Sequence, residues 1–471
     1  PADATIVASG LGTKGPEERD LPDSLKQDMD LCLHILRDVL GEFDPKLLST
    51  FDTVLGYAVE ASSEHFEDVM DDPNPDQNGL AKAVETIDNM KLHDAQLLAR
   101  AFATYFHLAN LSEENYRVAV LHQRENDVDD SQAVDPVNEM TGAYHQLINE
   151  MGPAKAKELL DKLEFHPVFT AHPTEARRKA VEGKIRRIAE LLEAHKILGG
   201  SDKKENLRRL YNEIDALFRT SPIALKKPTP VEEADTILDI FDNTLFHTIP
   251  TVYRRFDDWM LGSKAGLVEP VCPAFFHPGS WIGSDRDGNP NVTAKVSRQV
   301  ARKFSDHVIE ALEEATRTVG KNLTMETGTT PASDELKSLW NHQKEMSERL
   351  TDKAALISTK ETHRAVMLVM ADRLHYTVTR DADLMYHSCQ EFIDDLKVVQ
   401  RSLAAAGAHR SAYGPLQDLI WQAETFGFHM VEMEFRQHSV VHSRALEDIR
   451  EHGLHGERGP LPPRSEERRV G

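Results

Sequence analysis

The chain has 471 residues, long enough for one large domain or several small ones, each with a full hydrophobic core. Asp and Glu outnumber Lys and Arg by 78 to 55, and the resulting net charge of −23 argues against nucleic acid or an anionic membrane as a partner. The three widely spaced cysteines argue against a thiolate zinc site, and with neither a signal peptide nor an apolar run of about 18 residues they indicate a cytoplasmic protein.

The first part of the chain is expected to be helical. Residues 1–21 lack periodicity and are predicted to be a disordered lead-in. Residues 22–163 form a predicted N-terminal helical region, in which one helix face carries Leu25, Met29, Leu33, Leu36 and Leu40. Further helices are expected at about 46–69, 81–111 and 138–163.

The stretch around His172 changes from strand to helix. Val168–Thr170 predicts a short buried strand, and a helical pattern follows Pro173 with one face formed by Val181, Ile185, Ile188 and Leu192. His172 therefore lies at the carboxyl end of a strand, where ligands collect in barrels and open sheets. The helix start and the cations of 177–179 favour an anion there. By local chemistry alone, however, such a histidine is more often a turn residue.

A second motif follows a strand expected at Ser280–Ile282. Asp285 and Asp287 flank Arg286, an arrangement that can hold a guanidinium in a fixed direction so that its fork meets an oxyanion. The two carboxylates could instead be metal ligands, but no local partner completes such a set, and a structural turn is the favoured alternative. Thr293 is expected to cap the following helix, and Thr229 to cap a long helix that begins at about residue 231.

A third motif lies near the end of the chain. Val431, Met433 and Phe435 alternate with polar residues, which predicts a strand that ends at Arg436. An isolated Arg-Gln-His run is commonly only part of a polar surface. Residues 451–471 have no apolar periodicity and are predicted to be a disordered, non-native tail.

The three motifs together resemble those of phosphoenolpyruvate carboxylases. Thr170–Arg178 matches the histidine signature of that family, the run from Asp285 to Pro290 is similar to its arginine loop, with Ser284 where glycine is common, and Arg436 falls on its third arginine-bearing strand end. The resemblance covers the N-terminal half of the family. It implies a mainly α protein with an incomplete (β/α)8 (TIM-type) barrel over residues 164–450 and extensive helical additions, with the active site at the C-terminal strand ends.

The resemblance also implies a reaction and roles for residues. The reaction is carboxylation of phosphoenolpyruvate by bicarbonate to oxaloacetate and phosphate, with Mg²⁺ or Mn²⁺ and without biotin. His172 is then the catalytic base or its stabilising imidazolium, Arg436 holds the phosphoryl group, and Arg286, oriented by Asp285, supports the same pocket. The family's metal ligands belong to a C-terminal half that this chain lacks. We therefore expect no metal ligand here, an inactive isolated chain, and a homotetramer only for full-length members.

Two other functions are compatible with the sequence. His172 could be the phosphohistidine of a phosphoenolpyruvate-dependent phosphotransferase. The chain could also be an acidic helical scaffold without catalytic activity, because the C-terminal half is absent. The fate of label from phosphoenolpyruvate separates the two enzymes, and turnover of a His172→Asn variant separates both from the scaffold.

Overall fold

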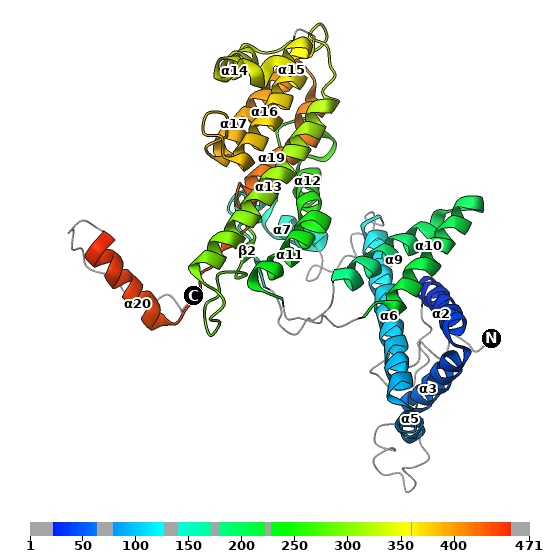
Figure 1. Cartoon of the computed structure of the whole chain (residues 1–471). Helices are drawn as coiled ribbons and strands as arrows, with labels where there is room; N and C mark the ends of the chain where they lie inside the picture. Colours follow the sequence, from blue (N-terminus) through cyan, green and yellow to red (C-terminus); the bar gives the residue numbers. More distant parts are fainter. Residues whose placement is uncertain are drawn as a thin grey trace. The chain divides into compact units, whose positions relative to one another are not determined.

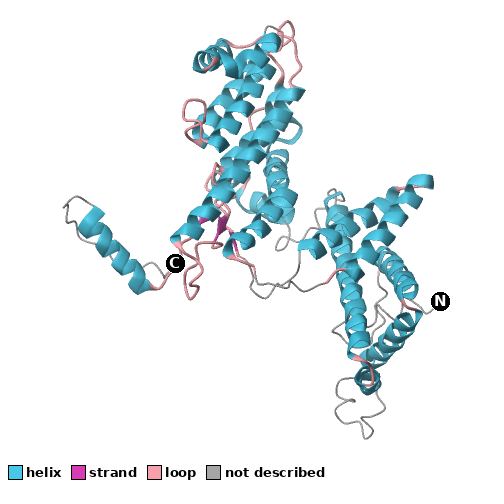
Figure 2. Cartoon of the chain, in the orientation of Figure 1, coloured by secondary structure: helices cyan, strands magenta, loops and turns pink. Residues whose placement is uncertain are grey.

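A computed structural model describes residues 22–63, 79–126, 140–170, 179–221, 228–358 and 360–453. These residues form many helices and three short strands (Figures 1 and 2). They divide into two compact units, each assembled from two segments of the chain. Unit 1 contains the described residues up to 143 and those from 179 to 221, and unit 2 contains those from 144 to 170 and from 228 to 453.

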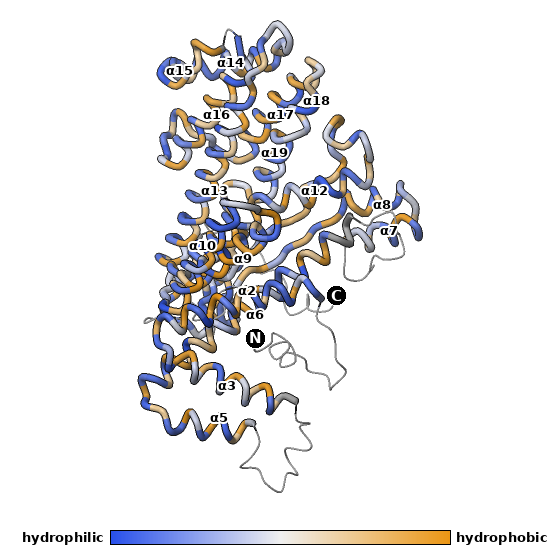
Figure 3. Tube along the Cα trace, turned by 90° about the vertical axis from the view of Figure 1, so that its right-hand side faces the viewer, coloured by the Kyte–Doolittle hydropathy of each residue, from blue (hydrophilic) through white to orange (hydrophobic). Residues whose placement is uncertain are grey.

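Unit 1 is a helical assembly around one hydrophobic core. Residues of all its helices contribute to that core, and the predicted helix face recurs in the buried side chains of Val181, Ile188 and Leu192. The hydropathy pattern along these helices can be followed in Figure 3. The helices are α2 (Asp23–Phe43), α3 (Pro45–Ser63), α5 (Gly79–Asp88), α6 (Leu92–Asn126), α9 (Lys179–Ile197) and α10 (Gly200–Arg219).

The order of the helices in unit 1 explains why the observed division differs from the contiguous one expected from the sequence. Helices α9 and α10 follow the first strand in the chain, yet α9 packs on α6 and α10 packs on α2. The expected single helix over 81–111 is also wrong, because a turn at residues 89–91 separates α5 from α6.

Unit 2 has its own hydrophobic core, which its long helices and its sheet share. Its helices are α7 (Met140–Met151, across the boundary), α8 (Pro153–Leu160), α11 (Pro230–Ile240), α12 (Phe246–Leu261), α13 (Ala294–Asn322), α14 (Asp334–Met346), α15 (Glu348–Ser358), α16 (Thr362–Thr379), α17 (Cys389–Ala405), α18 (His409–Tyr413), α19 (Pro415–Phe426) and α20 (Ser439–Asp448). The predicted caps are confirmed: Thr229 forms a capping box with Glu232 at the start of α11, and the Thr293 side chain accepts from Val296 N at the start of α13.

A π-helical turn, Phe241–Leu245, joins α11 to α12, which continues through Pro250. Proline cannot donate to the carbonyl one turn before it, so the Phe246 carbonyl loses its helical partner. The buried Gln422 of α19 replaces that partner, since its Nε2 donates to Phe246 O at 2.7 Å. A hydrogen bond from a distant helix therefore stabilises the interrupted turn.

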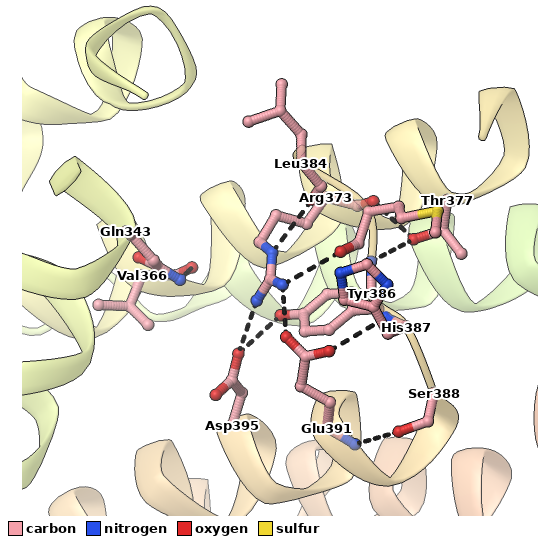
Figure 4. Close-up of polar contacts among 11 residues, drawn as sticks. Gln343, Val366, Arg373, Thr377, Leu384, Tyr386, His387, Ser388, Glu391 and Asp395 are labelled. Atoms are coloured by element: carbon pink, nitrogen blue, oxygen red, sulfur yellow. Dashed lines mark hydrogen bonds and ion pairs between the residues drawn. The ribbon is translucent and has the colours of Figure 1, made fainter. Parts of the chain in front are cut away.

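A buried arginine ties α16 to α17 and to the loop between them (Figure 4). The Arg373 guanidinium donates to Glu391 Oε1 at 2.6 Å and to Asp395 Oδ2 at 3.2 Å, and it also reaches the carbonyls of Leu384 and Met385. The Tyr386 ring lies under the guanidinium at 3.7 Å, and its hydroxyl donates to Asp395. We call these four residues, Arg373, Tyr386, Glu391 and Asp395, the arginine node.

The three strands form one parallel sheet in the order β1 (Val168–Phe169), β2 (Gly279–Ser280), β3 (Glu432–Met433). Val168 aligns with Gly279 and then with Glu432. Side chains alternate between the two faces of a strand, and Phe169 and Met433 are on the face that packs against the unit 2 core. The strands predicted near 168, 280 and 432 are confirmed, each shorter than expected, but β1 is half-buried and not buried as predicted.

Candidate active site

The loops after β2 and β3 run side by side. Beyond the strands, Asp285 pairs with Arg436 in an isolated parallel bridge. Arg436 N donates to Ser284 O at 3.2 Å, and Arg286 N donates to Arg436 O at 2.9 Å. The structure thus brings together three of the four residues that the sequence predicted for the site, namely Asp285, Arg286 and Arg436.

Helix α13 packs against the loop after β2 and holds its backbone in place. Gly283 has φ +73°, and a Cβ there would lie 2.6 Å from a methyl carbon of Val300, so a side chain is excluded on both grounds. Ser297 Oγ donates to the Gly283 carbonyl at 2.7 Å. The buried Ser284 hydroxyl donates to Glu434 O at 2.7 Å. Glycine is common at this position in the phosphoenolpyruvate carboxylases that the motif resembles. Here Ser284 replaces it and links the β2 loop to β3.

The guanidinium of Arg436 is fixed in direction, but its N–H donors make no hydrogen bond to the described residues. Its guanidinium lies 3.9 Å from the centre of the Trp281 ring, and Trp281 in turn donates through Nε1 to Glu434 at 2.7 Å. The nearest carboxylate oxygen, Asp285 Oδ2, is 3.9 Å from Nη1, too far for a hydrogen bond. Among the residues that the structure describes, the guanidinium has no hydrogen-bonding partner, and its side chain is 46% exposed. Its donors therefore remain available to a ligand.

Arg286 is held differently from the sequence-based expectation. Asp285 does not orient its guanidinium, because the Asp285 carboxylate accepts from Asp287 N at 3.2 Å and faces Arg436. Arg286 instead donates through Nη2 to Ser297 Oγ at 3.1 Å and lies over the Phe435 ring at 5.4 Å. Its Nε is buried and has no partner within the described part of the chain. Arg286 is thus packed under the loop, with one buried donor that has no acceptor among the described residues.

His172 lies in the segment 171–178, outside the described residues, so its predicted proximity to Arg436 stays a prediction. It follows Phe169, the last residue of β1, by three positions in the sequence. In chain order, each motif therefore comes directly after one of three adjacent parallel strands. The carboxyl ends of parallel strands meet at the same edge of a sheet.

Several contacts of the site could not be found from local sequence. Trp281 and Glu434 were not assigned a role, although alternation along β2 and β3 places them on one face with Arg436. Ser297 lies one turn into α13, and only the folded loop brings it to Arg286.

The described residues offer no metal centre. Within the ranges given above, no group of three or more His, Cys, Asp or Glu side chains could hold an ion. Nor is any described helix long and apolar enough to cross a bilayer.

Comparison with known proteins shows the family to which this chain, with its arginine-bearing sheet edge, belongs. The family model described as phosphoenolpyruvate carboxylase matches residues 25–458, and the chain belongs to that family. The enzyme called phosphoenolpyruvate carboxylase in Roseiflexus castenholzii is 35% identical over 380 residues, covering 76% of this chain and 40% of its own length.

Other relatives of the same name give the same relation. The protein from a Synechococcus strain is 31% identical over 435 residues, covering 80% of this chain and 41% of its own length. The protein from Azorhizobium caulinodans is 27% identical over 472 residues, covering 96% of this chain and 48% of its own length. The chain thus spans less than half the length of these relatives.

Proposed function

We propose that this chain supplies the arginine-bearing part of an active site that carboxylates phosphoenolpyruvate with bicarbonate, giving oxaloacetate and phosphate. The main supporting observation is Arg436, a guanidinium fixed in direction by Trp281 with its donors unused. Such a fork suits the oxygens of a phosphoryl group. Three consecutive parallel strands separated by helices also support the proposal that the sheet is part of a (β/α)8 barrel.

The chemistry explains why a cationic edge is required. An oxygen of bicarbonate attacks phosphorus, the enolate leaves, and carboxyphosphate forms. Carboxyphosphate then releases CO₂ and phosphate, and the methylene carbon of the enolate attacks CO₂. All reactants before that release are anions, so Arg436 would stabilise the transferred phosphoryl group, with Arg286 beneath it.

The role proposed for His172 is proton transfer. As a base it would accept the carboxyl proton when carboxyphosphate decomposes, and such general base assistance contributes a factor on the order of 10² to 10⁴ in rate.

The proposal includes a divalent ion, Mg²⁺ or Mn²⁺, bound outside this chain's described residues. Among the described residues at the sheet edge, Asp285, Asp287 and Glu434 offer carboxylates, but Asp285 is engaged by Asp287 N and faces Arg436, and Glu434 accepts from Trp281 Nε1. No group of three or more His, Cys, Asp or Glu side chains placed to hold an ion lies in the part of the chain that the structure describes. The described residues therefore do not fit the ion, and we assign no step to it. The homotetramer implied for full-length members also stays a prediction.

The test is binding of phosphoenolpyruvate to the chain, measured by calorimetry. We expect Arg436→Gln to weaken binding by roughly tenfold or more, because it removes a charge-assisted hydrogen-bond donor pair. Arg401→Gln is the matched control, since Arg401 is an exposed arginine paired with Glu335 on α14 and should leave binding unchanged. Equal affinities of Arg436→Gln and the unaltered chain would contradict the proposal.

Labelled phosphoenolpyruvate distinguishes the alternative enzyme. When the chain is supplemented with the remaining half of a relative, a carboxylase releases labelled phosphate only with bicarbonate present. A phosphotransferase instead accumulates acid-labile label on the polypeptide, and His172→Asn abolishes that label. The second result would replace the carboxylase proposal.

A further inference from the structure

The tripeptide Phe-His-Pro occurs twice in unit 2, each time at the entrance to a strand. Residues 165–167 precede β1, and residues 276–278 precede β2. The two copies are paired in parallel register, because Phe165 and Phe276 form an isolated bridge just before the sheet begins. Each residue type of one copy therefore lies beside the same type in the other.

The paired side chains contact each other on both faces of the two strands: the histidines on one face and the phenylalanines on the other. The rings of His166 and His277 are stacked, with centroids 4.8 Å apart and planes inclined by 25°. The rings of Phe165 and Phe276 lie 5.8 Å apart, and Phe165 is half exposed. The imidazole stack is thus a side-chain contact between β1 and β2 at the end of the sheet opposite the arginines.

Few backbone hydrogen bonds join the two strands beside this stack. Phe165 N donates to Phe275 O at 2.7 Å, His277 N donates to Phe165 O at 2.8 Å, and Gly279 N donates to Pro167 O at 2.8 Å. Pro167 and Pro278 have no N–H of their own, so each contributes only a carbonyl. A strand with so few hydrogen bonds depends strongly on the contacts beside it.

Both carboxylates near the stack approach His166, and no described carboxylate forms an ion pair with His277. His166 Nε2 lies 3.5 Å from Glu164 Oε2, and its Nδ1 lies 3.9 Å from Glu432 Oε2. His429, before β3, is within electrostatic reach of His277 and Glu432. In the described part of unit 2, these are the titratable groups recorded as facing the pair.

The third strand does not extend the stack. Its entrance carries Phe428-His429-Met430, and the register of β2 with β3 places Met430, not His429, beside His277. Met430 also has φ +66°, an uncommon conformation for a residue with a side chain. The paired arrangement is therefore specific to β1 and β2.

We propose that His166 and His277 form a proton-operated clamp that holds β1 against β2 while at most one of the two rings is protonated, and that loosens β1 when both are. Two like charges at the observed separation repel each other, and the two exposed glutamates both approach His166, which leaves a charge on His277 without a counterion in the described part of unit 2. Histidine is the side chain whose charge ordinarily changes near neutral pH. Because β1 leads directly to the segment that contains His172, the clamp would act on the strand that precedes that segment. This inference does not depend on the proposed function.

Amide hydrogen exchange tests the clamp on the chain as it is. The amides of Phe165, His277 and Gly279 report pairing of β1 with β2, and those of Glu432 and Glu434, which donate to Pro278 O and Ser280 O, report pairing of β2 with β3. After correction for intrinsic exchange rates, we expect protection of the first set to fall by about tenfold between about pH 7.5 and about pH 5, and that of the second set to change less.

Variants attribute the effect to the two rings. His277→Gln and His166→Gln should each abolish the loss of protection, since neither can hold two charges. His375→Gln is the control, because His375 is an exposed histidine near Glu313 on α13, away from the sheet, and should retain the loss. The amides of Glu432 and Glu434 verify folding of each variant. Unchanged protection in the unaltered chain, or a loss that persists in both Gln variants, would overturn the proposal.

Discussion

Arg373 and Arg436, both in unit 2, each lie against an aromatic ring and face an aspartate, but Arg373 is buried and Arg436 is half exposed. The guanidinium of Arg373 lies 3.7 Å from the centre of the Tyr386 ring, and that of Arg436 lies 3.9 Å from the centre of the Trp281 ring. Each also faces an aspartate. The Arg373 side chain is 2% exposed and makes four hydrogen bonds, whereas the Arg436 side chain is 46% exposed and lies 3.9 Å from its carboxylate.

The difference teaches how to distinguish a structural arginine from a binding one. Burial makes every unpaired donor costly, so an arginine that stabilises the fold is surrounded by acceptors. An arginine that binds a ligand should be held by contacts that leave its donors unused, as an aromatic face and a distant carboxylate hold Arg436, for which we propose such a role. The comparison predicts large stability effects at the arginine node and small ones at the sheet edge.

The largest expected effect is at Arg373. Arg373→Met should lower the free energy of unfolding of unit 2 by about 3 to 5 kcal/mol, because it leaves Glu391 and Asp395 as uncompensated, partly buried carboxylates. All four tryptophans belong to unit 2, so tryptophan fluorescence during urea unfolding measures this unit.

Arg401→Met, at an exposed ion pair on α17, is the control for losing a cation and should cost about 1 kcal/mol or less. Equal costs at Arg373 and Arg401 would contradict the comparison.

A smaller effect should appear in the way the free energy of unfolding depends on pH through the arginine node. Burial raises the pKa of Asp395 to about 6, although the Tyr386 hydroxyl and the Arg373 charge oppose the rise. A raised folded-state pKa means that this stabilisation is complete below the unfolded value of 3.8 and is lost as pH rises through about 6. Asp395→Asn retains an acceptor for Tyr386 and has no such loss.

Between about pH 4 and about pH 7, the stability of the unaltered chain relative to Asp395→Asn should therefore fall by up to about 3 kcal/mol. Urea unfolding at several pH values measures the difference. A difference that is constant over this range would show that Asp395 does not titrate within the fold as described.

The smallest effect is expected at the sheet edge. Arg436→Gln should change the free energy of unfolding by no more than about 0.5 kcal/mol, since the side chain is half exposed and its ion pair is long. The same variant is expected to lose affinity for phosphoenolpyruvate. A destabilisation comparable to that of Arg373→Met would mean that Arg436 is structural and would weaken the functional proposal.

The sequence predicted the parts of the fold that depend on neighbours along the chain. Alternating or β-branched runs located the three strands, and Thr229 and Thr293 marked two helix starts because capping involves residues only three positions apart. The resemblance to phosphoenolpyruvate carboxylases implied that Asp285, Arg286 and Arg436 share one pocket, and backbone hydrogen bonds bring the three residues side by side.

Contacts between distant segments were not predictable. Arg373 gave no sequence signal, since its partners are on another helix and in a loop. The direction of the Asp285 carboxylate depends on the position of Arg436, which lies far along the chain. The two-unit division depends on where α9 and α10 pack, which hydrophobic periodicity does not specify.

The interleaving of the two units has a consequence for synthesis on the ribosome. Strand β1 is translated long before β3, and at about 5 to 20 residues per second the interval is roughly 10 to 50 s. Unit 1, whose last helix precedes β2 in the chain, can fold during that interval. The nascent chain would thus carry a finished helical body and an unpaired strand, the kind of surface that chaperones bind.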